Sequence, residues 1–115
     1  MCSSDLSSTA EIAVDCYPAA PETLHGMAES MGMQTAMEIL LSMEMNEYGV
    51  EGLTIEYTAC ENGVHLVETV FEHQQLRHSI ALMLDGEAWW QVFVMTNETE
   101  EGTREIMNEL LQKMR

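Results

Sequence analysis

The chain has 115 residues, 46% of them hydrophobic, which predicts one globular domain rather than a disordered chain. Its formal net charge is −16, from 20 acidic and 4 basic residues, and residues 1–76 contain no Lys or Arg. This excludes nucleic acid as a direct partner and disfavours an anionic membrane, because binding either depends on Lys and Arg neutralising phosphates. A basic protein surface would instead be attracted.

The N-terminus and the cysteines give weak signals about location. No apolar run approaches the roughly 20 residues of a spanning helix, and the first residues lack the basic and apolar regions of a signal peptide. Cys2, Cys16 and Cys60 follow no metal or disulfide spacing. We therefore expect a cytoplasmic protein. Residues 1–6 look like the translated end of a sequencing adapter joined to a metagenomic fragment. We accordingly expect residues 1–8 to be disordered or artefactual and residues 9–115 to form a single domain.

The first predicted element is a short strand at Glu11 to Tyr17. Its residues alternate, with Ile12, Val14 and Cys16 on one side. This pattern is typical of a strand, and we expect it to add to one edge of the main sheet.

Residues 21–48 are helical in pattern but interrupted. Gly32 predicts a kink or a division into two helices, because Gly costs about 1 kcal/mol relative to Ala in a helix interior. Thr35 and Glu38 then fit a capping box for the second helix, and Gly49 is a plausible left-handed stop.

Six of the 11 methionines fall in this helical segment. Methionine fills irregular gaps and also serves adaptable binding surfaces, so core packing and a partner groove both fit. Thioether ligation of Cu(I) is disfavoured, because residues two apart on a helix do not face each other. The six residues are Met27, Met31, Met33, Met37, Met43 and Met45.

Residues 53–96 predict four strands joined by three turns. Asn62-Gly63 and Asp85-Gly86 are typical of two-residue hairpin turns, which need φ > 0 and fix the register. The middle turn has no Gly, and we assume a four-residue loop over residues 74–77. The resulting register pairs Tyr57 with Glu68, Ala59 with Leu66, His73 with His78 and Leu82 with Trp89.

Alternation sorts these strands into two unlike faces. The first is almost wholly apolar and must be covered by helix: Leu53, Ile55, Tyr57, Ala59, Val64, Leu66, Val70, Ala81, Met83, Trp90, Val92 and Val94. The second is polar on the first strand and apolar on the last two: Thr54, Glu56, Thr58, Cys60, His65, Thr69, Phe71, His73, His78, Ile80, Leu82, Trp89, Phe93 and Met95. Its apolar half is explained by another element of the same chain, by a dimer or partner surface, or by a ligand pocket.

Residues 97–115 predict a closing helix. Glu98, Glu100 and Glu101 near its start and Lys113 near its end favour the helix dipole, and Thr103 is an alternative cap. The predicted buried stripe is Ile106, Met107, Leu110, Leu111 and Met114.

The candidates for chemistry are few. His65, His73 and His78 share one predicted face, but Glu72 points to the other, so the usual three or four converging metal ligands are missing. Surface histidines or a pH-sensitive interface remain. Glu68, opposite Tyr57, could act as an acid or base, but no second catalytic group stands beside it.

We therefore expect an α+β fold, a four- or five-stranded antiparallel meander packed by a broken Met-rich helix and a C-terminal helix, without catalytic, metal or cofactor sites. The leading hypothesis is a non-enzymatic acidic protein that docks on the basic surface of a nucleic-acid-binding protein, as an inhibitor of anti-CRISPR, immunity or antitoxin type. Its candidate partner-binding residues are Glu38, Glu44, Glu47, Glu51, Glu56, Glu61, Trp89 and Phe93.

Two other hypotheses stay open. One is a cytoplasmic chaperone or adaptor that holds an apolar segment of a partner, since small acidic secretion chaperones have a similar helix–sheet–helix layout. The other is a ligand-binding or catalytic domain that uses the histidines or Glu68 with Tyr57. A homodimer through the Met-rich helix or the Trp89 face is compatible with any of the three.

Overall fold

The computed structural model describes residues 10–49, 55–59 and 63–114. It confirms the predicted α+β class, and the sheet has five strands. The elements in chain order are β1 (Glu11–Tyr17), α1 (Glu22–Met31), α2 (Met33–Asn46), β2 (Glu56–Ala59), β3 (Val64–His73), β4 (Leu76–Asp85), β5 (Ala88–Thr96) and α3 (Glu100–Met114).

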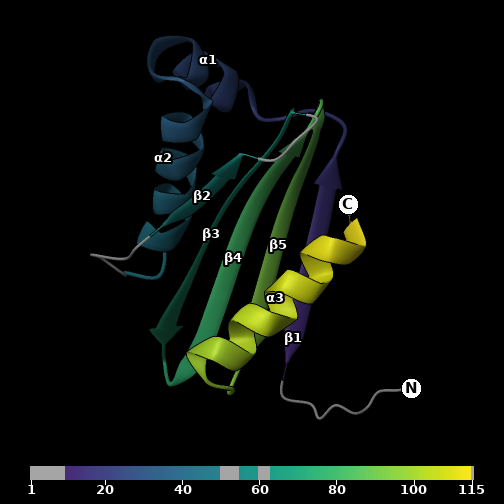
Figure 1. Cartoon of the computed structure of the whole chain (residues 1–115). Coiled ribbons are helices and arrows are strands. Elements are labelled where there is room, and N and C mark those ends of the chain that lie inside the picture. The colour runs from purple at the N-terminus through teal and green to yellow at the C-terminus, as the bar shows by residue number, and fades with distance from the viewer. Residues whose placement is uncertain (1–9, 50–54, 60–62, 115) are drawn as a thin grey trace.

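The molecule has three layers, with the sheet between two helical layers (Figure 1). The strand order is β1-β5-β4-β3-β2, and every neighbouring pair is antiparallel. Helices α1 and α2 pack on one face and α3 on the other. We call these the α1–α2 side and the α3 side. Within the described residues, no helix combines the length and apolar character needed to cross a membrane.

Each side of the sheet has its own hydrophobic core. On the α1–α2 side, buried helix residues such as Leu24, Met37 and Leu41 meet the inward side chains of β3, β4 and β5. On the α3 side, Met107 and Leu111 meet a second set of strand residues. Of the six methionines in α1 and α2, Met37 and Met45 are buried in the core and Met27 and Met33 pack against it, whereas Met31 and Met43 are exposed.

The strand predicted at the N-terminus is confirmed as an edge strand. β1 pairs with β5 along its whole length, from Glu11 opposite Met95 to Tyr17 opposite Trp89. All seven of its residues are exposed. It has a neighbour on one side only.

The predicted register of β2 is wrong by one residue. Tyr57 pairs with Val67 and not with Glu68, and Ala59 pairs with His65 and not with Leu66. A two-residue turn at Asn62-Gly63 would pair Ala59 with Leu66, which the observed register contradicts. Gly63 has φ +77°, and Asn62 lies outside the described residues. A one-residue shift moves every side chain to the opposite face.

The shift changes the side of the sheet toward which each β2 side chain points. Ile55 and Tyr57 pack in the α1–α2 core, whereas the sequence placed them on the other face. Glu56 moves to the α3 side, opposite Glu68.

The other two hairpins differ from prediction by two residues, and this keeps the faces. Gln74 and Gln75 form a two-residue turn with φ of +52° and +68°, so His73 pairs with Leu76 and not with His78. At the last hairpin Asp85 pairs with Ala88, and consequently Leu82 faces Gln91 and not Trp89. Sequence patterns missed the first case because non-Gly residues rarely occupy two left-handed positions in succession.

The helix break at Gly32 is confirmed, where φ is +90°. The predicted capping box is wrong: α2 begins at Met33, ahead of Thr35, and has no side-chain cap. The cap of α3 is Thr99, whose Oγ1 accepts a hydrogen bond from the Gly102 N–H at 3.0 Å. Thr103, the cap considered from sequence, lies inside the helix and its hydroxyl donates to the Thr99 carbonyl at 2.8 Å.

Candidate partner-binding site

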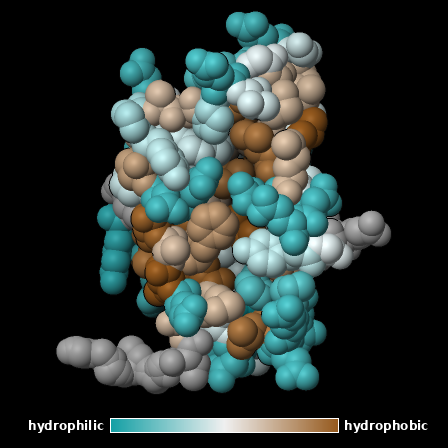
Figure 2. Space-filling model, turned by 180° about the vertical axis from the view of Figure 1, so that it is seen from behind, coloured by the Kyte–Doolittle hydropathy of each residue, from teal (hydrophilic) through white to brown (hydrophobic). Residues whose placement is uncertain are grey.

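The two sides of the sheet are covered unequally. Helix α2 contacts β3 and β4, so the α1–α2 layer lies over the half of the sheet that ends in β2. On the same side, the half of the sheet formed by β5 and β1 extends past the helices and is covered by them only in part. Figure 2 shows this side of the molecule, where hydrophobic surface is visible among hydrophilic residues. Another part of the same chain therefore covers the apolar face only in part.

A hollow of about 350 Å³ lies on the uncovered half. Three strands form its floor and Tyr48, just after the end of α2, forms part of its wall. Its residues are Glu11, Ile12, Ala13, Tyr48, His78, Ser79, Ile80, Phe93, Val94 and Met95. We call it the β1–β5 hollow. Phe93 and Met95 are half-buried within it, so apolar surface is available to a partner.

An aromatic and histidine cluster stands at the α2 wall of this hollow. The His78 ring stacks on Phe71, with centroids 5.2 Å apart and planes at 8°. Tyr48 lies 5.5 Å from the rings of both His73 and His78, and 5.4 Å from Phe71. These contacts fix Tyr48, and with it the end of α2, against the sheet.

The cluster changes the protonation of His78. Burial lowers the pKa of His78, and the charge of His73 lowers it further. A hydrogen bond from His78 Nε2 to the His73 carbonyl oxygen, at 3.4 Å, opposes this effect. The neutral form is therefore favoured, and a cation does not form readily in this wall of the hollow.

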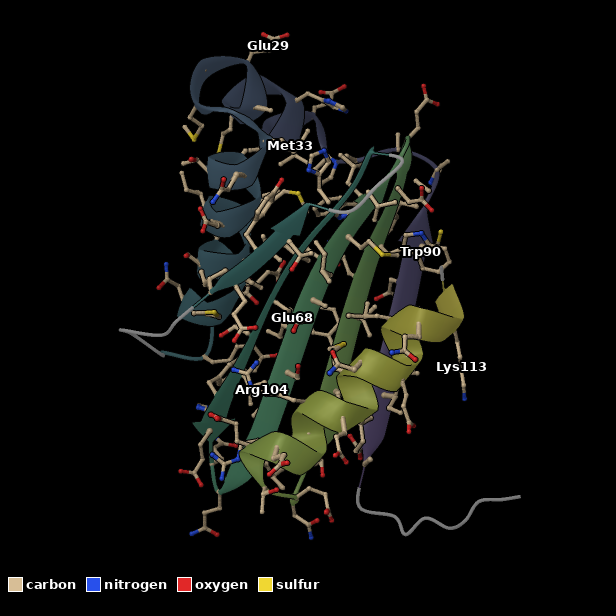
Figure 3. All side chains as sticks on the ribbon, in the orientation of Figure 1. Glu29, Met33, Glu68, Trp90, Arg104 and Lys113 are labelled. Atoms are coloured by element: carbon tan, nitrogen blue, oxygen red, sulfur yellow. The ribbon has the colours of Figure 1, made fainter. Side chains whose placement is uncertain are left out.

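The described cations lie on one side of the sheet, whereas carboxylates lie on both. The described cations are Arg77 in β4 and Arg104 and Lys113 in α3. Arg104 donates to the Glu56 carboxylate at 2.9 Å, on the α3 side. Figure 3 shows Arg104 and Lys113 on α3, and Glu29 on α1 pointing away from the sheet.

The α1–α2 layer and β1 carry carboxylates and no described Lys or Arg. Their acids are Glu11, Asp15, Glu22, Glu29, Glu38, Glu44 and Glu47. Burial raises the pKa of Glu44, and the neighbouring Glu47 carboxylate raises it further, so these two acids repel each other. A cation brought to this end of α2 would relieve that repulsion.

The structure brings together only some of the predicted partner-binding residues. Glu38, Glu44 and Glu47 follow one another along α2 and the turn after it, and Phe93 lies in the β1–β5 hollow. Glu56 lies on the opposite side of the sheet, paired with Arg104. Glu51 and Glu61 lie outside the described residues.

Trp89 does not belong to a docking surface. Its side chain is 1% exposed, inside the α1–α2 core. The sequence placed it correctly on the second apolar face, but the helices cover that part of the face. The Trp89 side chain itself is therefore not accessible to a partner in this structure.

The structure separates Glu68 from Tyr57, and His65 from His73 and His78. His65 Nδ1 hydrogen-bonds with the Tyr57 hydroxyl at 2.5 Å, so Tyr57 is paired with His65 rather than lying against Glu68. Glu68 faces α3 (Figure 3). Within the described ranges, three or more His, Cys, Asp or Glu side chains nowhere gather in an arrangement that could hold a metal ion.

Sequence reasoning missed Tyr48 as part of the hollow, and it placed Met95 on the correct face without naming it as a partner-binding residue. The signal that could have identified Tyr48 is its place immediately before Gly49, the predicted end of the helix. An aromatic side chain at the end of a helix that packs on a sheet can contact the side chains of the strands. Comparison with known proteins adds nothing to this picture: no family model, curated protein or solved structure matches the chain.

Proposed function

We propose that this is a non-enzymatic binding protein whose α1–α2 side docks on a basic surface of a partner protein. The observation that carries the proposal is the division of charge: α1, α2 and β1 hold carboxylates only, whereas the described Lys and Arg belong to β4 and α3. Such a surface attracts and orients a cationic partner.

The natural partners are nucleic-acid-binding proteins, because their functional surfaces gather Lys and Arg to meet phosphates. An acidic protein on such a surface would occupy the place of DNA or RNA. This makes an inhibitor of anti-defence, immunity or antitoxin type the sharpest form of the proposal. No catalytic step is required of any residue in it.

The test is capture from lysate of a plausible host with three baits of known charge. The first is the native chain. The second carries Glu38→Gln, Glu44→Gln and Glu47→Gln on the α1–α2 side. The third carries Glu101→Gln, Glu105→Gln and Glu109→Gln on α3, and so changes the net charge by the same amount.

The proposal expects one nucleic-acid-binding protein, identified by mass spectrometry, on the native and α3-variant baits. The complex should dissociate in a few hundred millimolar salt, because the Debye length there falls below about 8 Å. Equal capture by all three baits, or no basic protein on any of them, would contradict the proposal.

The β1–β5 hollow supports a second candidate, a chaperone or adaptor that holds an apolar segment of a partner. Phe93 is half-buried there and offers ring surface that no described helix covers. On this alternative, capture survives salt and is lost with Phe93→Ser, whereas the α2 Gln variant behaves like the native chain. The two candidates therefore predict opposite results from the same baits.

A further inference from the structure

The free edge of β1 lacks most of the features that usually protect an edge strand. Native sheets block their edges with short strands, charged side chains (above all Lys), Pro or bulges, and of these β1 has only the charges of Glu11 and Asp15. β1 has seven residues in unbroken register with β5, contains no Lys or Pro, and exposes Ile12 at 48% and Val14 at 43%. β2, at the other edge, has only four residues.

We infer that β1 pairs with β1 of a second copy of this chain, antiparallel and centred on Val14, so that two sheets become one. In a symmetric antiparallel pair, facing residues lie on the same side of the sheet, so the two-fold axis must pass through a residue position. Centring on Val14 uses all seven residues. It places Val14 opposite Val14, Ile12 opposite Cys16, Ala13 opposite Asp15 and Glu11 opposite Tyr17.

The charges of β1 select this register over its neighbours. Centring on Ala13 would place Glu11 opposite Asp15, and centring on Asp15 would place that residue opposite itself. Like charges directly opposite each other destabilise a strand pair. The Val14 register avoids both, and it covers the exposed side chains of Ile12 and Val14 with those of the second copy.

The dimer would also extend the β1–β5 hollow. Glu11, Ala13, Asp15 and Tyr17 lie on the α1–α2 side, by their pairing with β5. Glu11 and Ala13 line the hollow, and Tyr17 is 45% exposed. Pairing places Tyr17 of the second copy beside Glu11, so the two hollows meet across the two-fold axis. This part of the inference rests on the proposed function.

The decisive test is a disulfide that only this register allows. In a Cys2→Ser, Cys60→Ser background, Ile12→Cys should cross-link under mild oxidation to native Cys16 of a second copy, because facing residues of a strand pair lie within disulfide reach. Within one chain the two positions are four strand residues apart and cannot join. The matched control is Ala13→Cys, whose side chain points to the other side of the sheet, and Cys16→Ser should abolish the cross-link.

Light scattering on the native protein gives the second readout. We expect twice the 13.0 kDa chain mass. The dimer should strengthen as salt rises to about 0.5 M, because screening weakens repulsion between two acidic chains. Val14→Lys, at an exposed position, should give a folded monomer.

A monomer mass in high salt, or equal cross-linking through positions 12 and 13, would overturn the inference. The response to salt distinguishes failure of the dimer from failure of the proposed function. As salt rises, the dimer should become more stable, whereas the complex with a basic partner should become weaker. If the dimer forms, Tyr17→Ala, at the outer end of the strand pair, should weaken partner binding more than it weakens the dimer. Unchanged partner binding would overturn the joined hollow.

Discussion

Replacing Leu41 by Ala should be among the most destabilising single changes in α2. Leu41 is 0% exposed and lies in the core between α2 and the sheet. The change removes three carbons, at about 0.8 kcal/mol each, and leaves a cavity, so we expect a loss of about 3 kcal/mol in the free energy of unfolding. Met43→Ala, on the same helix with the native side chain 53% exposed, is the matched control and should cost less than about 0.5 kcal/mol.

Chemical denaturation gives the free energy of unfolding of both variants and thermal denaturation gives their Tm, each followed by circular dichroism. An unfolding entropy of about 2.1 cal/mol/K per residue, over 115 residues, converts 3 kcal/mol into a fall in Tm of about 12 °C. If Met43→Ala cost as much as Leu41→Ala, α2 would present another face to the sheet. The hollow beside its C-terminal end would then lose its wall.

Three further changes test other parts of the structure. The pKa of His78 is lowered by burial, so the unfolded chain takes up the proton first and the His78 contribution to stability falls as pH drops below about 6.5. The stability of the native protein relative to His78→Gln should therefore fall between about pH 7.5 and pH 5. A difference in stability that stays constant over this range would contradict the lowered pKa of His78. Replacing Gln74-Gln75 by Asn-Gly should raise the free energy of unfolding by about 0.5–1 kcal/mol, since both native residues have positive φ; a loss in denaturant melts would refute the turn geometry. Thr99→Ala should cost about 1 kcal/mol by removing the bond to the Gly102 N–H, whereas Thr99→Ser should restore it; equal melting of the two variants would rule out the cap.

The sequence predicted the elements well, because each leaves a local mark. The β1 alternation, the break at Gly32 and the long strands after Val64 all depend on side-chain period or on one glycine. The predicted apolar face of β3, β4 and β5 is also the observed one, since errors of two residues in a hairpin preserve alternation.

The site was less predictable, because it depends on how far one layer covers another. No local pattern states that α2 reaches β4 and leaves β1 and the Phe93–Met95 part of β5 only partly covered. The register error at β2 had the largest effect: it placed Tyr57 beside Glu68, whereas the structure pairs the Tyr57 hydroxyl with His65. The sequence predicts the correct face for Trp89 but not that the helices bury its side chain.

The charge asymmetry of the sequence persists in the fold. The absence of Lys and Arg over residues 1–76 becomes, in the fold, an α1–α2 layer and an edge strand without a described cation. β1, α1 and α2 all precede the first cation in the sequence, Arg77 of β4. A pattern along the sequence is thus converted into a difference between two sides of one sheet.

The most direct test of this account measures the affinity for the captured partner as a function of salt. Native protein, the α2 variant (Glu38→Gln, Glu44→Gln, Glu47→Gln) and the α3 variant (Glu101→Gln, Glu105→Gln, Glu109→Gln) are compared by titration calorimetry. We expect the native protein and the α3 variant to lose affinity steeply and in parallel as salt rises, and the α2 variant to bind weakly with a shallower slope. Equal affinities and slopes for the two variants would show that the α1–α2 side is not the docking surface.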